Sequence, residues 1–136
     1  MKESRELAAA RRHLGAVEAD IVGAQSEYHL DEALLLLEDL VAGGGPESGI
    51  AGNIGRTYVG RLESAIRAVG LAPGDVPETV LERLLNLIRS LAPSDFAPEG
   101  LPELHVQIGV RYIDAVYEGY PQRDKDAVLA RILDAE

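Results

Sequence analysis

Three histidines, His13, His29 and His105, are the side chains of this sequence best suited to bind a transition metal. A di-iron centre in a helical bundle needs a glutamate three residues before each ligating histidine, and none of the three has one. His29 and Glu32 lie one turn apart on a predicted helix and would supply two ligands, but no second pair completes a site. The sequence contains no cysteine, so thiolate ligands are absent as well. We therefore expect no specific transition-metal site.

The other candidates for chemistry each lack an essential partner. Gly44 and Gly49 have the spacing that opens a phosphate-binding loop, but Ile50 and Ala51 stand where that motif needs lysine and serine or threonine. The six serines show no local signature of a serine nucleophile, and a cysteine nucleophile is excluded. Carboxylates are abundant, which on exposed helices normally serves solvation rather than acid–base catalysis. We expect no catalytic residues, no cofactor and no enzymatic activity.

The negative charge of this chain is concentrated in one stretch. The formal net charge is −10, and no lysine or arginine occurs between His13 and Gly55. Eight carboxylates give that stretch a net charge of −8, whereas the other 93 residues have a net charge of −2. A chain this acidic is poorly suited to non-specific nucleic-acid binding, which requires cations that neutralise phosphates. We expect no nucleic-acid partner.

A helix predicted over residues 27–42 lies within this acidic stretch, and its outer face combines acidic with apolar side chains. The candidate partner-binding residues on that face are Glu27, Tyr28, Asp31, Glu32, Leu35, Glu38 and Asp39. Tyr28 and Leu35 lie seven residues apart, opposite the core-facing stripe of the same helix. An apolar anchor within a charged rim is typical of protein interfaces. This face therefore predicts binding of a basic protein partner, as by an inhibitor, an immunity protein or an adaptor.

Three alternatives remain open at the level of sequence. In the first, a neighbouring helix covers Leu35 and the acidic residues serve only to keep the protein in solution. In the second, the chain is a structural homo-oligomer, such as a homodimer, with apolar helix faces paired and acidic faces outward. In the third, a small-molecule or enzymatic site lies between the third and fifth helices. The polar lining of that site would be Arg56, Tyr58, Arg111 and Tyr112.

The elements that position these residues are predicted to be helices. Leucine and alanine together number 37, against 21 for valine, isoleucine and threonine, and this ratio favours helix over strand. The seven prolines fall between segments of helical periodicity. Apolar stripes predict six helices. Four of them cover residues 4–24, 27–42, 76–92 and 122–134. The third helix in the chain begins between residues 48 and 53 and ends at 69, and the fifth begins at 102 and ends before 119. Asp75 and Glu78 are expected to cap the fourth helix, and the fifth, apolar on more than one face, is expected to be central.

Length and hydrophobicity indicate a single domain. With 136 residues, of which 46% are apolar, the chain is long enough to form one core. We predict one all-α domain over residues 1–136, with five or six helices in an orthogonal bundle or a short helical-hairpin stack. Ile54-Gly55-x-x-Tyr58 reappears 54 positions later as Ile108-Gly109-x-x-Tyr112, which indicates either repeated hairpins or chance agreement between amphipathic helices.

No segment of the sequence is suited to a membrane. The longest uninterrupted apolar run covers residues 33–37, whereas about 20 apolar residues are needed to cross a bilayer. Charged residues occupy the N-terminal positions where a secretory signal would place its apolar stretch. We expect a cytoplasmic protein without membrane contact.

Overall fold

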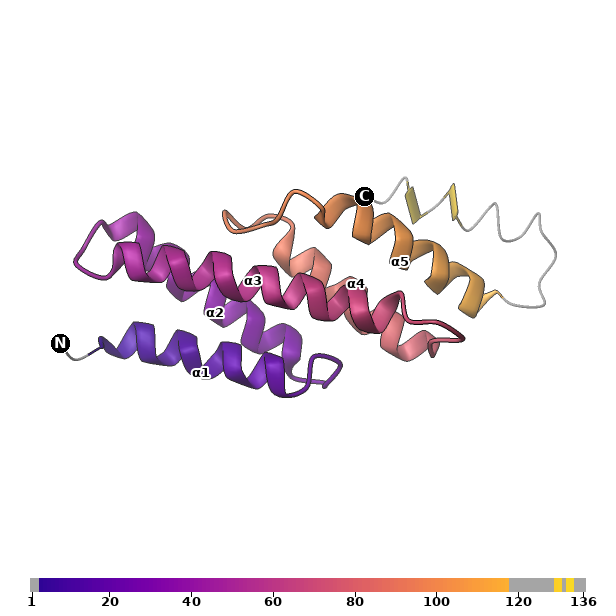
Figure 1. Cartoon of the computed structure of the whole chain (residues 1–136), viewed down its shortest axis with the longest axis horizontal. Coiled ribbons are helices and arrows are strands. Elements are labelled where there is room, and N and C mark those ends of the chain that lie inside the picture. The colour runs from indigo at the N-terminus through magenta and orange to yellow at the C-terminus, as the bar shows by residue number, and fades with distance from the viewer. Residues whose placement is uncertain (1–2, 118–128, 131, 134–136) are drawn as a thin grey trace.

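The computed structural model describes residues 3–117, 129, 130, 132 and 133, and its elements are helices that alternate in direction along the chain (Figure 1). They are α1 (Arg5–Ala19), α2 (Ser26–Gly43), α3 (Ser48–Gly70), α4 (Glu78–Leu91) and α5 (Leu101–Val116). The described residues are 76% helical and contain no strand, so the all-α prediction is confirmed. The predicted last helix, residues 122–134, lies largely outside the described residues.

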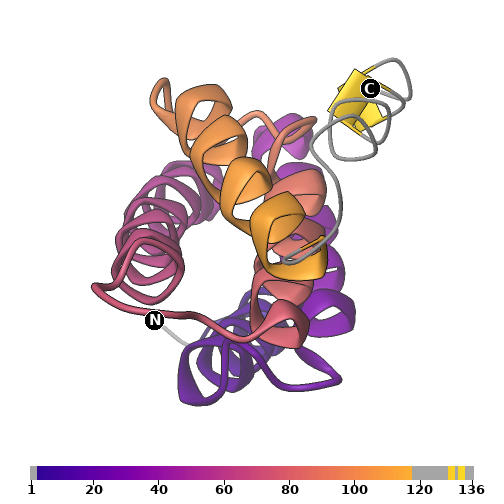
Figure 2. The same ribbon diagram turned by 90° about the vertical axis from the view of Figure 1, so that its right-hand side faces the viewer.

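Neighbouring helices pack in an order that follows the chain. α1 packs mainly on α2, α2 also packs on α3 and α4, and α5 packs mainly on α4. Viewed end-on, the helices surround a common axis, so each turns one face inward (Figure 2). All five contribute to one cluster of buried apolar side chains. These helices therefore pack together around one core, as either alternative, the orthogonal bundle or the short helical-hairpin stack, requires.

α4, rather than α5, is the most deeply buried helix. Its six buried side chains are Leu81, Leu84, Leu85, Leu87, Ile88 and Leu91. On α5 only Leu101, Leu104, Ile108 and Ile113 are buried, whereas Val106 is 62% and Val110 48% exposed. The prediction that the fifth helix is central is therefore wrong. The reason is that α5 packs mainly on α4 and only slightly on α3, while a groove runs along the side that carries Val106 and Val110, where Leu129, Ile132 and Leu133 also line it.

Two predicted helix ends also differ from the structure. α1 ends at Ala19 rather than near residue 24, because Asp20 leaves the helical conformation with φ −157° and ψ 82°. α4 begins at Glu78 after Pro77 in an extended conformation, and no side chain caps its first turn. Asp75 therefore lies two residues outside the N-cap position, where it cannot form the expected capping box.

A glycine in α3 allows the α4–α5 loop to pack closely on that helix. A methyl group at Gly55 would lie 2.7 Å from the ring of Phe96, a buried residue of the loop. At Gly60, one and a half turns further along, a methyl group would meet nothing within 4 Å. The same is true of Gly109, so the two glycines of the 54-residue repeat lie in different surroundings. Tyr58 and Tyr112 of that repeat are both more than half buried.

No helix among the residues described here is long and apolar enough to cross a membrane.

Candidate functional site

The outer side of α2 carries two large apolar side chains that no described helix covers. Leu30, Ala33, Leu34 and Leu37 turn to the core, as their spacing predicts. On the opposite side Tyr28 is 54% exposed and Leu35 56% exposed. Seven residues of helix separate them by about 10 Å along the axis. Within the described residues, the alternative in which a neighbouring helix covers Leu35 is therefore not supported.

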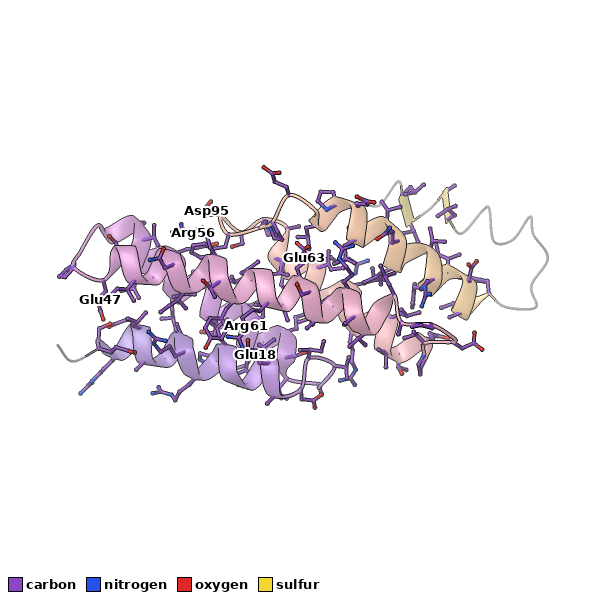
Figure 3. The ribbon with its side chains drawn as sticks, in the orientation of Figure 1. Glu18, Glu47, Arg56, Arg61, Glu63 and Asp95 are labelled. Carbon is purple, nitrogen blue, oxygen red and sulfur yellow. The ribbon has the colours of Figure 1, made fainter. Side chains whose placement is uncertain are left out.

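Five carboxylates surround these two side chains and complete the acidic face, defined as Glu27, Tyr28, Asp31, Glu32, Leu35, Glu38 and Asp39. Glu27, Asp31 and Asp39 are exposed, and Glu32 and Glu38 are partly buried. The ion pairs of the described residues join Arg11 to Glu3, Arg61 to Glu18 and Arg67 to Glu63. Figure 3 shows Arg61 of α3 and Glu18 of α1 side by side. None of these ion pairs involves α2. The negative potential of this face is therefore not offset by ion pairing within the part of the chain that the structure describes.

A groove of about 320 Å³ follows the acidic face on the side of α4. It is lined by Asp31, Leu34, Leu35, Glu38, Ser90, Pro93 and Ser94. The side chains of Leu34 and Leu35 thus lie between two carboxylates. Asp31 lies one turn before them on α2, and Glu38 lies one turn after them. Glu38 also accepts a long hydrogen bond, 3.4 Å, from the backbone N–H of Asp95, which ties this end of the face to the α4–α5 loop.

Tyr28, at the other end of the acidic face, lies against two histidines. Its ring is edge-on to His13 of α1, with centroids 6.0 Å apart, and also contacts the ring of His29, 5.3 Å away. The Nδ1 atoms of His13 and His29 lie 2.8 Å apart. Sequence reasoning missed this cluster, because only the packing of α1 on α2 brings together two histidines that are 16 positions apart.

The four polar side chains of the alternative site between α3 and α5 do not converge. Arg56 donates a hydrogen bond to Asn53, and the Arg61 guanidinium lies over the Tyr58 ring. Arg111 donates to the carbonyls of Gly70 and Ala72. Tyr112 lines a groove against α4. The structure therefore does not support that alternative in the form stated, and α3 and α5 make few contacts. Burial and the nearby carboxylates of Glu82 and Glu78 raise the pKa of Tyr112, while Arg89 partly opposes them.

The described residues contain no group of three or more histidine, aspartate and glutamate side chains that could hold a metal ion. A second groove, of about 450 Å³, lies between α4, α5 and the C-terminal residues Leu129, Ile132 and Leu133, and its lining is mostly apolar. Comparison of the chain with protein-family models, with curated proteins and with solved structures finds no match.

Proposed function

We propose that this protein is a non-enzymatic binding module whose acidic face binds a cationic protein partner. One observation carries the proposal: Tyr28 and Leu35 are each more than half exposed, among carboxylates that have no ion-pair partner in the described chain. Exposed apolar side chains at the centre of a charged surface are typical of interface anchors.

The two kinds of side chain have different roles in this proposal. The carboxylates attract a basic partner and speed its association, because long-range charge steers the encounter. Tyr28 and Leu35 lose their exposed area on binding and so slow dissociation. The groove beside Leu35 suits an apolar side chain flanked by lysine or arginine, since its leucine surface lies between Asp31 and Glu38.

Binding experiments with two sets of variants test these roles. Glu32→Lys with Asp39→Lys is expected to remove capture of a basic protein at low salt and to weaken the salt dependence of association. The matched control is the double reversal Glu99→Lys with Asp114→Lys, at exposed carboxylates away from α2. Leu35→Ala is expected to speed dissociation, with Val110→Ala as the exposed apolar control on α5.

The outcome follows from which variants lose the partner. A basic protein that both controls retain and both α2 variants lose supports the proposal. Equal retention by all four variants contradicts it, and so does equal loss from the controls and the α2 variants.

A structural homo-oligomer is the second candidate function, and the exposed Val106 and Val110 on α5 favour it. Sedimentation velocity at two concentrations separates the candidates. The binding module is expected to remain a monomer. A stable dimer that Val106→Asp or Leu35→Asp dissociates would instead show that apolar helix faces pair.

A further inference from the structure

His13 and His29 bring two imidazole nitrogens together across the α1–α2 interface. Their Nδ1 atoms lie 2.8 Å apart, their ring centroids 5.1 Å apart, and their ring planes are tilted by 38°. Such a contact requires one Nδ1 to donate and the other to accept. The two nitrogens therefore already face one another. Both histidines are partly exposed, so a small ion can reach them from solvent.

We propose that these two imidazoles form a site for a borderline divalent cation such as Zn²⁺ or Ni²⁺, which then holds α1 against α2. Zinc–nitrogen bonds of about 2.0–2.1 Å at a tetrahedral angle place the two nitrogens about 3.3 Å apart. The observed separation is shorter by about half an ångström, so a small rotation of the rings admits the ion. Imidazole nitrogen suits these cations, whereas Mg²⁺ prefers oxygen ligands.

The protons balance when the cation binds to the neutral pair. The ring that donates through Nδ1 gives up that proton to water, and its Nε2 takes one from water, so the ring changes tautomer without changing charge. Both Nδ1 lone pairs are then available to the ion, and water completes its coordination. The site lies within the stretch of net charge −8, whose potential favours a cation. This proposal does not depend on the proposed partner of the acidic face.

Thermal melts of the tag-free full chain with added Zn²⁺ test the site. An ion that binds only the folded state raises the melting temperature. We expect a rise of several degrees with Zn²⁺ and none with Mg²⁺. His13→Gln and His29→Gln should each abolish the rise, measured against the metal-free melt of the same variant. His105→Gln, which removes the histidine of α5, should retain it. An equal rise in all three variants, or no rise in the wild-type chain, would overturn the proposal.

NMR of the imidazole groups in the wild-type chain gives a second readout that needs no variant. During a Zn²⁺ titration, the ring signals of His13 and His29 should change together and reach completion at one equivalent, while those of His105 stay in place. Equal changes at all three histidines would show non-specific binding and refute the site. Unchanged His13 and His29 signals would show that their contact is only a structural hydrogen bond.

Discussion

Truncation of Leu35 to alanine tests whether the central apolar residue of the acidic face is free on the isolated protein. Leu35 is 56% exposed and borders a groove that is open to solvent. Complete burial of a leucine side chain contributes about 1.5–3 kcal/mol, and Leu35 has less than half of its surface buried. Its removal leaves no closed cavity, and alanine is slightly the better helix former. We expect the free energy of unfolding to fall by about 1 kcal/mol or less.

The matched control is Leu37→Ala, two residues along the same helix. Leu37 is fully buried, so its truncation leaves a cavity in the core and is expected to cost about 2–5 kcal/mol. For a domain of this size, 1 kcal/mol corresponds to a melting-temperature shift of about 4 °C. Leu35→Ala should therefore melt within a few degrees of the wild-type protein, and Leu37→Ala far below it.

Urea unfolding followed by circular dichroism, with each variant first shown to be a monomer by sedimentation, measures both free energies. The two leucines differ in exposure but not in helix or residue type, so the comparison isolates burial. A loss of 2 kcal/mol or more for monomeric Leu35→Ala would refute the reasoning, because it would mean that another part of the chain covers this side chain. The acidic face would then retain its charge and Tyr28 but lose Leu35 as an apolar anchor.

Three further predictions concern contacts between elements. Gly55→Ala should lower the free energy of unfolding by about 1–3 kcal/mol, because its methyl group would lie 2.7 Å from a buried phenyl ring. Gly60→Ala, in open space on the same helix, should raise it by up to about 1 kcal/mol, and the reverse order in urea melts would contradict this contact. Arg111→Ala removes the donor to the carbonyl of Gly70 at the end of α3, 3.2 Å away, and to that of Ala72 in the following loop, 2.7 Å away. This change should cost about 1–2 kcal/mol of unfolding free energy. Arg111→Lys should recover only part of this, and a thermal melt of the alanine variant that matches wild type would argue against the bonds. Hydrogen bonds from the Ser4 hydroxyl and backbone N–H lower the pKa of Glu47 below 4.5. The ionised Glu47 carboxylate therefore contributes its full stabilisation above the unfolded-state pKa. That stabilisation is lost as the pH falls through the folded-state pKa. The Ser4 amide signal should follow this titration with an inflection below pH 4.5 in the wild-type chain and none in Glu47→Gln, and an inflection at or above 4.5 would count against it.

Helix positions were the most predictable feature of this fold. On α2 the spacing of Leu30, Leu34 and Leu37 identified both the helix and its buried side, because a 3.6-residue period allows only one stripe to face the core. The same period placed Tyr28 and Leu35 on the outer side. It did not locate the end of α1, since Ile21 and Val22 pack against the core from the following turn and continue the apolar pattern beyond the helix.

The sequence by itself determined the all-α class, the face that α2 buries and the concentration of negative charge on α2, because periodicity and charge are local properties of the chain. Only the tertiary structure decided which helices become neighbours. It left Leu35 beside α4 rather than beneath it, and it left Val106 and Val110 of α5 exposed. It also joined His13 to His29, Arg111 to Gly70 and Asp95 to Glu38, pairs that are 16, 41 and 57 positions apart. These contacts depend on how all the apolar stripes are buried together, and no single stripe specifies its partner.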